Sequence, residues 1–491
     1  MKAPAWHLAA VAIMVTPTTH CVSIPPRESD GLRVVALQIE RQAPRDPIHR
    51  DKRRMKRDPF SVGLDNAETL YFINATVGTP PEAVRLHIDT GSSDLWVNTP
   101  SSTYCTSARN PCAAAGTYTP NASTTYQYVN SKFNITYVDG SSASGDYVSD
   151  TLTFGSQAVP RLQLGVGYAS TNPQGILGIG YPSNEVQVTR HGLPPYRNLP
   201  EQLVADGVIR SSAYSMWLND LSATTGSILF GGVDAARYEP PLRSVPVETA
   251  TGSYREFMVT LTKLQLGGLT LGRGEDLAIA VLLDSGSTLT YLPDRLAGEL
   301  FDAVNATYDA DANAAYVPCT LAQGADNLTF TFSEPAIPVG LGELVLDVTL
   351  ASGRQPAYAD GTPACLFGVA AAAGGTYVLG DTFLRSAYVV FDLENHEISL
   401  APTRFLAAAS GAAVAAAASS VKEIGVGMGS VPGASRVQNA VRPTEGLRGG
   451  KSSGGIPSGP MSAASGTGVM WKAAAAAAAA VGVTAVMGSW V

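Results

Sequence analysis

Two aspartates in this 491-residue chain each open a short turn of small residues directly after a hydrophobic strand. The first turn is Asp89-Thr90-Gly91-Ser92, and it follows residues 84–88, in which Val, Leu and Ile alternate with Arg and His. The second turn is Asp284-Ser285-Gly286-Ser287, and it follows the continuous apolar run Leu277–Leu283. One such turn alone is weak evidence, because turns favour Asp and Gly. Two of them, each placed after a strand, indicate that the two carboxylates act together.

The chemistry open to such a pair is hydrolysis of a peptide bond by an activated water molecule. Two carboxylates about 3 Å apart cannot both ionise, so the pair holds one proton over a wide acidic range. The ionised group can accept a proton from water while the protonated group donates to the peptide carbonyl oxygen. We expect Gly91 and Gly286 to let the backbone come close, so that peptide N–H groups bond the carboxylates. We expect Ser92 and Ser287 to bond the outer carboxylate oxygens. Which aspartate is the base belongs to the coupled pair, and the sequence does not assign it.

The elements that carry these turns occur twice along the chain. Gly175-Ile176-Leu177-Gly178 lies 86–89 residues after Asp89, and Tyr377-Val378-Leu379-Gly380 lies 93–96 residues after Asp284. Between residues 58 and 403, short β-runs are punctuated by Gly, Pro, Asn and Ser, which is typical of an all-β domain. The predicted helices are few and short, and they are Glu201–Asp206 and Asp294–Val304. The repeat therefore predicts an all-β fold made of two similar lobes, each contributing one aspartate.

Five segments that include these motifs resemble one family of enzymes. They are Ile88–Val97, Ile176–Gly180, Ser227–Gly232, Leu283–Thr288 and Val378–Leu384. They resemble the pepsin-like aspartic endopeptidases and, within them, the fungal GPI-anchored yapsin-like branch, over about residues 58–402. The resemblance implies a bilobal, pseudo-symmetric fold with a cleft between the lobes. It also implies catalysis by Asp89 and Asp284 without a cofactor or a metal ion.

The resemblance further implies a β-hairpin flap that closes over the substrate. Residues 135–141 fit this element, because alternating residues precede a turn signal at Asp139-Gly140. Tyr137 is then the flap tyrosine, with its hydroxyl reaching toward Trp96; taken alone, it would be a half-buried strand residue. Asp139 lies near the predicted tip and is expected to meet a Lys or Arg side chain of the substrate, as acidic flap residues do in the similar fungal enzymes. The alternative for Asp139 is a simple turn-forming role.

The formal charge of −8 hides an uneven distribution along the chain. Residues 1–57 carry 11 basic and 5 acidic residues, a net of +6, while residues 58–403 carry 15 and 34, a net of −19. So acidic a body repels nucleic acid and favours cationic substrates. We expect the basic segment before residue 58, which is predicted to be a propeptide, to dock over this body at neutral pH. We expect it to loosen as carboxylates of the body become protonated. The chain departs from typical yapsins in lacking a long acidic insertion between Cys105 and Cys112, which argues against strict dibasic specificity.

The two ends of the chain carry processing signals. A short apolar run at residues 8–15 is typical of a signal peptide, and a basic stretch ending at Arg57 is typical of a proprotein cleavage site. Near the C-terminus, small residues at Ser462, a short spacer and the apolar tail 473–491 match a GPI-attachment signal. A permanent transmembrane helix is the alternative for that tail. The predicted order is signal peptide 1–22, propeptide 23–57, N-terminal catalytic lobe 58–240, C-terminal catalytic lobe 241–403, an Ala/Gly/Ser-rich flexible stalk 404–462 and a removed segment 463–491.

Sequons and cysteines also favour an exported protein. Five Asn-x-Ser/Thr sites are candidate glycosylation sites, and they are Asn74, Asn121, Asn134, Asn305 and Asn327. Apart from Cys21 there are four cysteines, which allow three pairings, and their spacing favours Cys105–Cys112 and Cys319–Cys365. This spacing is not that of a zinc site, and export makes disulfides the expected state. The predicted location is the outer face of the plasma membrane or the cell wall.

Rival chemistries lack the residues that they need. The body has no His-Glu-x-x-His zinc motif and no Gly-x-Ser-x-Gly nucleophile elbow. A glycosidase also uses two carboxylates, but nothing else here points to sugar chemistry. The remaining alternative is a catalytically inactive pepsin-like wall-binding glycoprotein, in which a motif residue should have changed. We therefore predict a monomeric aspartic endopeptidase whose partners are peptide or protein substrates, a proprotein-processing protease and, through its GPI lipid, the membrane.

Overall fold

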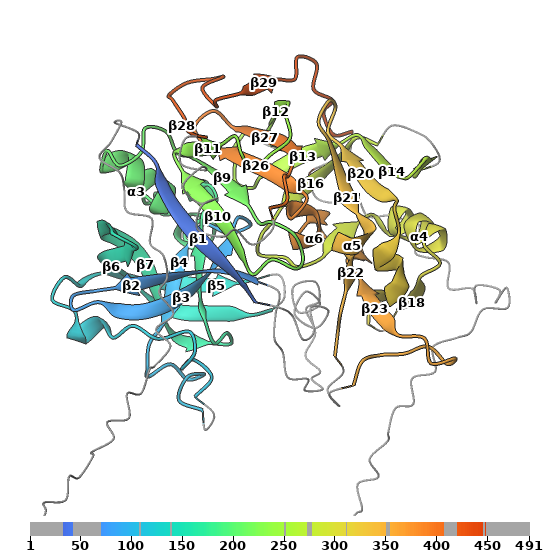
Figure 1. Ribbon diagram of the computed structural model, residues 1–491. Helices are drawn as coiled ribbons and strands as arrows, with labels where there is room; N and C mark the ends of the chain where they lie inside the picture. Colours follow the sequence, from blue (N-terminus) through green and yellow to red (C-terminus); the bar gives the residue numbers. More distant parts are fainter. Residues whose placement is uncertain are drawn as a thin grey trace, which may run out of the picture.

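The computed structural model describes residues 33–42, 70–444 and Leu447, except for 108–109, 138–139, 250–251, 273–276, 311, 350–353 and 407–419. The described chain is built mostly of β-strands, as the sequence predicted (Figure 1). Its helices are short, and they are α2 (Val186–Thr189), α3 (Leu199–Ala205), α4 (Asp294–Ala303), α5 (Leu341–Leu344), α6 (Asp381–Leu384) and the 3-10 turns η1 (Pro120–Ala122), η2 (Pro182–Asn184) and η3 (Cys319–Gln323). The two predicted helices correspond to α3 and α4, within two residues at each end.

One large sheet contains most strands of the N-terminal half and also includes strands from the C-terminal half. In spatial order its strands are β29 (Ala434–Arg436), β12 (Leu242–Pro246), β27 (Glu397–Pro402), β26 (Ala387–Asp392), β9 (Ala213–Trp217), β10 (Thr225–Phe230), β1 (Val35–Gln42), β2 (Leu70–Val77), β3 (Glu82–Asp89), β8 (Gly175–Gly178), β4 (Leu95–Asn98), β7 (Gln157–Ser170), β6 (Ser142–Phe154) and β5 (Gln127–Thr136). Strands from the end of the chain thus pair directly with strands that precede the midpoint. This pairing joins the two halves through a shared base.

The C-terminal half adds smaller sheets. The first contains β13 (Met258–Leu261), β16 (Ile279–Leu283), β25 (Val378–Leu379), β17 (Thr290–Leu292) and β24 (Val369–Ala371). The second contains β15 (Leu269–Thr270), β14 (Lys263–Leu266), β20 (Asn327–Thr331) and β21 (Ala336–Gly340). The third contains β18 (Thr307–Asp309), β19 (Ala314–Pro318), β23 (Ala364–Phe367) and β22 (Val345–Leu346). Together with α4 and α5 they form the right-hand part of Figure 1.

The internal repeat seen in the sequence is a repeat of strand pairing. In the N-terminal half, β3 carries Asp89 at its end and pairs in parallel with β8, while β4 pairs with β8 in the antiparallel sense. In the C-terminal half, β16 ends directly before Asp284 and pairs in parallel with β25, while β17 pairs with β25 in the antiparallel sense. In both halves, therefore, the strand with the apolar-apolar-Gly ending is inserted between the strands on either side of the aspartate turn. This arrangement fixes the position at which each turn leaves its sheet.

Strand β1 lies inside the segment predicted as a propeptide. It pairs with β10 from Val35 to Glu40 on one side and with β2 from Glu40 to Gln42 on the other. Its Ile39 side chain is completely buried. In Figure 1 this strand, in dark blue, crosses the N-terminal half between β10 and β2. The basic segment ahead of the predicted cleavage site therefore includes a strand of the main sheet.

Residues 420–444, which we call the C-terminal strap, pack against the body (Figure 1, orange-red). Within the strap, β28 (Val421–Glu423) pairs with β11 (Gly232–Asp234), and β29 pairs in parallel with β12. Ile424 and Val431 are buried against residues of the sheet in a small hydrophobic cluster. The strap is therefore ordered, whereas the composition of this segment predicted a flexible stalk. Composition did not predict the order, because backbone pairing and only two apolar side chains hold the strap in place.

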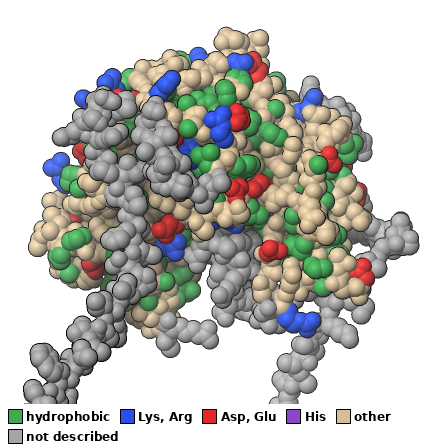
Figure 2. Space-filling view, in the orientation of Figure 1, with side chains coloured by type: hydrophobic (Ala, Val, Ile, Leu, Met, Phe, Trp, Pro, Cys, Tyr) green, Lys and Arg blue, Asp and Glu red, His purple; other side chains and the backbone are tan. Residues whose placement is uncertain are grey.

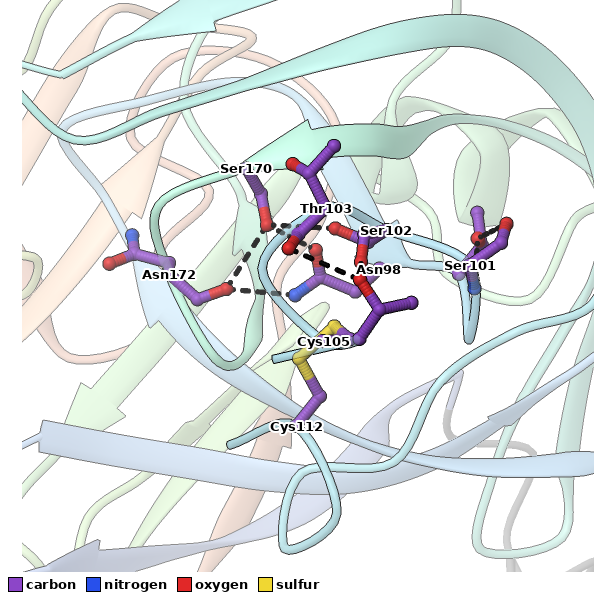
Figure 3. Close-up of a disulfide and its surroundings, with 10 residues drawn as sticks. Asn98, Ser101, Ser102, Thr103, Cys105, Cys112, Ser170 and Asn172 are labelled. Atoms are coloured by element: carbon purple, nitrogen blue, oxygen red, sulfur yellow. Dashed lines mark hydrogen bonds between the residues drawn. A yellow bond between two sulfur atoms is a disulfide. The ribbon is translucent and has the colours of Figure 1, made fainter. Parts of the chain in front are cut away.

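The described part of the chain contains two disulfides, and they are the two favoured by spacing. Cys105 and Cys112 lie 5.2 Å apart at their Cα atoms, and Cys319 and Cys365 lie 5.0 Å apart. Figure 3 shows the first disulfide next to a polar network at the end of β4, in which Ser170 donates to Asn98. The short loop that it closes thus follows the strand that leaves the first aspartate turn.

The surface bears on the predictions of export. All five sequon asparagines are exposed, which keeps them accessible to a glycosyltransferase. On the face shown in Figure 2, acidic and basic side chains lie interspersed among uncharged ones. Within the described residues, no helix is long and apolar enough to cross a membrane. Arg57, Ser462, the signal peptide and the tail 463–491 lie outside the described residues.

Candidate active site

The two aspartates are held by the same set of donors. For Asp89, the Gly91 N–H donates to Oδ1 at 2.9 Å, and the Ser92 hydroxyl donates to Oδ2 at 2.6 Å. For Asp284, the Gly286 N–H donates to Oδ1 at 2.7 Å, and the Ser287 hydroxyl donates to Oδ2 at 2.7 Å. Each carboxylate is buried, with 2% and 7% of its residue surface exposed, respectively. Hydrogen bonds to both oxygens fix the orientation of each carboxylate, as the sequence predicted.

The two carboxylates meet where the halves join. A methyl carbon added to Gly91 would lie 2.6 Å from Asp284 Oδ1, and one added to Gly286 would lie 2.4 Å from Asp89 Oδ1. Each motif glycine therefore lies directly against the carboxylate of the other half. Both distances are shorter than carbon–oxygen contact, so glycine is required at both positions for this approach. The close approach predicted from the repeat is present in the structure.

Thr90 and Ser285 cross-link the two turns through a set of bonds that the sequence did not reveal. The Ser285 N–H donates to the Thr90 hydroxyl oxygen at 2.9 Å, and the Thr90 N–H donates to the Ser285 hydroxyl oxygen at 3.2 Å. The Thr90 hydroxyl then donates to Leu283 O at 2.9 Å, and the Ser285 hydroxyl donates to Ile88 O at 3.0 Å. Each hydroxyl thus bonds the opposite half twice. The signal available in sequence was a hydroxyl residue at the second position of both turns.

This arrangement supports general acid–base hydrolysis. Two carboxylates at one site can divide the work of general base and general acid. One can accept a proton from a water molecule while the other donates a hydrogen bond to a carbonyl oxygen. The donors are fixed before the substrate arrives, so no reorganisation is needed during the reaction. The chemistry therefore depends on side chains of the protein itself.

Comparison with known proteins agrees with this geometry. The family model described as "Eukaryotic aspartyl protease" matches residues 70–403, which span both aspartate turns. This chain belongs to that family. It is 47% identical over 441 residues to "Probable aspartic-type endopeptidase opsB" of Aspergillus oryzae, covering 89% of this chain and 87% of that protein. The protein of the same name from Aspergillus fumigatus is 46% identical over 439 residues, covering 88% and 87%.

A more distant relative extends the same conclusion. "Secreted aspartic protease 1" of Candida albicans is 38% identical over 369 residues, covering 74% of this chain and 88% of that protein. The protein is thus an aspartic-type endopeptidase, and its substrates are peptides or proteins. The predicted enzyme class and fold class are both confirmed by these likenesses.

The protease carries a hairpin at the expected place in the chain. Strands β5 and β6 pair down to Thr136 and Ser142, and the Tyr137 N–H donates to Ser141 O at 2.8 Å. The Trp96 indole N–H donates to the Tyr137 hydroxyl at 2.7 Å, which is the contact predicted for the flap tyrosine. Gly140 adopts a φ of +78°, a conformation that suits glycine in a tight turn. Asp139 lies outside the described residues, so its role remains a prediction.

Beneath the hairpin of this protease lie two buried acids that sequence reasoning missed. Asp94 is 1% exposed and accepts hydrogen bonds from three donors, and burial raises the pKa of its carboxyl group. Glu185 is completely buried, and burial, reinforced by the nearby Asp94, raises the pKa of its carboxyl group to about 10. Their proximity could not be read from the sequence, because they lie 91 positions apart along the chain.

Proposed function

We propose that this aspartic endopeptidase is made as a secreted zymogen, cleaves extended peptides at acidic pH with a preference for basic residues, and is tethered outside the cell through a GPI lipid. The observation that carries the catalytic part is the matched set of donors on Asp89 and Asp284. Those donors fix the orientation of both carboxylates where each lies against the glycine of the other half. An inactive wall glycoprotein has no need of such a matched pair.

The experiment on activity uses the processed chain, purified from a fungal expression host. Cleavage of a mixed peptide library is measured from pH 3 to pH 7, with and without pepstatin, beside the Asp89→Asn variant. We expect cleavage on the acid side that is lost with the inhibitor and with the substitution. Absence of cleavage by a folded, propeptide-free protein would instead favour the wall-binding alternative. The expressed chain should extend beyond Thr444, because the C-terminal strap packs on the body.

The zymogen proposal is supported by strand β1, which precedes Arg57 and pairs on both of its edges. Cleavage after Arg57 alone leaves this pairing intact, so loss of the propeptide requires separation of β1 from β10 and β2. Protonation of carboxylates on the acidic body weakens its attraction for a basic segment with a net charge of +6. We therefore expect an uncleavable Arg57→Ala pro-form to be inhibited at pH 7 and to gain activity on acidification. A pro-form that stays fully inhibited at pH 3 contradicts release by acid.

A preference for basic residues is proposed for Asp139. It adjoins Gly140, whose N–H donates to Tyr137 O and closes the hairpin turn. A carboxylate at that place attracts a Lys or Arg side chain entering the cleft from a substrate. We expect Asp139→Ala to lose activity on Lys- and Arg-containing peptides and to keep it on apolar ones. Equal losses on both peptide sets would assign Asp139 to the turn alone.

Tethering at Ser462 and glycosylation of the five sequons complete the proposal. The exposure of all five asparagines supports glycan attachment, and the relative from Candida albicans is named a secreted protease. We expect a phosphatidylinositol-specific phospholipase to release the protease from intact cells, and we expect Ser462→Leu to reduce that release. Retention after lipase treatment, with extraction only by detergent, would favour a permanent transmembrane helix. Glycan occupancy can be read from the mass loss of each Asn→Gln variant.

A further inference from the structure

Asp94 lies five residues after the catalytic Asp89 and directly before β4. Its Oδ1 accepts hydrogen bonds from the Tyr147 hydroxyl at 2.5 Å and from the Tyr196 hydroxyl at 3.0 Å. Its Oδ2 accepts a hydrogen bond from the Val186 N–H at 2.9 Å. Burying a carboxylate costs free energy unless several donors compensate for the lost water. Three donors converge here from three separate parts of the chain.

The other half of the molecule serves as an internal control. Leu289 lies five residues after Asp284, so it holds the position that Asp94 holds in the first half. The side chain of Leu289 is apolar, 1% exposed and part of the main hydrophobic core. An aspartate turn of this type therefore folds with an apolar residue at that place. We therefore relate the carboxyl group of Asp94 to an element of the N-terminal half other than the aspartate turn.

The additional element is the β5–β6 hairpin. Tyr147, which bonds Asp94, lies on β6, the strand that returns from the hairpin tip. Its ring makes an edge-on contact with Phe133 on β5 at 5.4 Å between ring centres, and Phe133 in turn lies beside Trp96. All of them belong to one buried cluster at the base of the hairpin. Asp94 is thus connected to both strands of the flap.

Asp94 and Trp96 both bond the hairpin. Asp94 directly precedes β4, and Trp96 lies within it. Trp96 donates to Tyr137 near the tip, whereas Asp94 accepts from Tyr147 farther down the return strand. The hairpin is therefore held at two points by one short segment that follows the first aspartate turn. Such a connection ties the height of Tyr137 to the position of Asp89.

A third side of the network is closed by Glu185 and Tyr196. The Tyr196 N–H donates to Glu185 Oε2 at 2.8 Å, while its hydroxyl bonds Asp94. The Glu185 carboxyl remains protonated at acidic and neutral pH, since its pKa is raised to about 10 by burial. The Asp94 carboxyl group, with three donors from separate parts of the chain, is thereby held in one orientation.

We infer that Asp94 is a positioning residue for the flap, acting through Tyr147 to hold Tyr137 at its working distance from the catalytic aspartates. The inference rests on the proposed role of the flap in closing over the peptide. Loss of the Asp94–Tyr147 bond frees the return strand and lets the flap sample raised positions. Substrate binding and the chemical step both require the lowered position, so kcat/KM falls while the fold persists.

The decisive comparison pairs Tyr147→Phe with Tyr118→Phe in the full chain after processing. Both tyrosines are completely buried, and Tyr118 donates to Asp150 at 2.5 Å, as Tyr147 donates to Asp94. Each substitution removes one hydroxyl and keeps the ring, and each carboxylate keeps other donors. The two losses of stability should be similar. Of the two, only Tyr147 belongs to the buried cluster that joins the flap strands to Trp96.

We expect Tyr147→Phe to lower kcat/KM for a peptide substrate about tenfold, mostly through KM, as removal of one hydrogen bond to a charged group does. Tyr118→Phe should stay within about twofold of the unaltered protease. Asp94→Leu, which copies Leu289, should lower kcat/KM further, and Asp94→Asn should recover part of the loss because its amide oxygen still accepts a hydroxyl. If Asp94→Leu fails to fold, the tyrosine pair still decides.

Two outcomes overturn separate statements. Equal kcat and KM for Tyr147→Phe and Tyr118→Phe, with similar losses of melting temperature, would reduce Asp94 to a purely structural role. That result counts against the inference alone when Asp89→Asn is inactive in the same preparations. Activity that survives Asp89→Asn would instead remove the proposed function on which the inference depends.

Discussion

The two aspartate turns are alike, but the elements behind them differ. In both halves a glycine N–H and a serine hydroxyl bond the carboxylate at distances that agree within 0.2 Å. Behind the first turn lie Asp94 and Trp96, which bond the hairpin. At the corresponding places behind the second turn lie Leu289 and Tyr291, which are buried in the main hydrophobic core.

The second turn is supported from outside its own half. Ala278, at the start of the run into β16, accepts a hydrogen bond from the Thr444 N–H of the C-terminal strap at 2.9 Å. Arg442 of the strap pairs with the buried Glu248 at 2.7 Å, and Glu248 also accepts from Thr260 on β13, the neighbour of β16. The two turns are thus alike in their hydrogen bonds, whereas their surroundings differ. Asp94 and Trp96 connect the first turn to the hairpin, and the C-terminal strap contacts the strands beside the second, an arrangement that we call the brace.

The largest effect should come from removing either carboxylate. Asp89→Asn and Asp284→Asn each leave an amide that cannot share the proton, so we expect kcat to fall about 10³-fold or more in both. The measurement is steady-state hydrolysis of one peptide, with circular dichroism as the control for folding. If one variant kept a tenth of the activity, the two turns would not be equivalent in chemistry.

The next effect tests the contact between the turns. Gly91→Ala and Gly286→Ala each place a methyl group against the opposite carboxylate, at 2.6 Å and 2.4 Å from the nearest oxygen. We expect a loss of kcat of about 10²-fold in each, since a displacement near 1 Å misaligns the reacting groups. Gly298→Ala on α4 is the matched control, because no atom lies within 4 Å of its added carbon. Normal activity in Gly286→Ala would mean that Gly286 lies farther from the Asp89 carboxylate than it does in the structure.

A third effect concerns the buried acid that the first half holds. The pKa of Glu185 is about 10 in the folded protein, against an ordinary value of 4.5. A folded pKa above the unfolded value means that this contribution to stability is fully present below pH 4.5 and is lost as pH rises toward 10. We expect the melting temperature to fall from pH 5 to pH 8, and we expect Glu185→Gln to flatten this fall. An unchanged slope in that variant would trace the pH dependence to other groups.

The hydrogen bonding of the two aspartate turns was predictable from the sequence alone. A repeated Asp-x-Gly motif after apolar strands carries its meaning locally, because the donors to Asp89 and Asp284 lie two and three residues away. The disulfides and the Trp96–Tyr137 contact followed from spacing and from family resemblance. The close approach of Gly91 and Gly286 to the carboxylates was also implied once the repeat was recognised.

The supports were not predictable in the same way. Asp94 bonds Tyr147 and Tyr196, which lie 53 and 102 positions away, and the strand run around Asp94 gives no sign of either partner. The C-terminal strap was mistaken for a flexible stalk, because its low content of large apolar residues suggested that it could not pack. The strap packs by pairing its backbone with the edges of β11 and β12. Amino-acid composition does not indicate which strand edges are available for such pairing.

The smallest expected effect tests the brace of the second half. Arg442→Ala removes the partner of Glu248, whose side chain is 5% exposed, whereas Arg295→Ala removes an exposed pair with Glu299 on the surface of α4. We expect the first substitution to lower the free energy of unfolding by about 1 kcal/mol and the second by a few tenths. Chemical denaturation measures both. Since the dyad bonds are untouched, kcat should change less than about twofold. A larger loss of kcat in Arg442→Ala would mean that the strap helps to position Asp284 as well as to stabilise its half, and the second half would then have an active support comparable to Asp94 in the first.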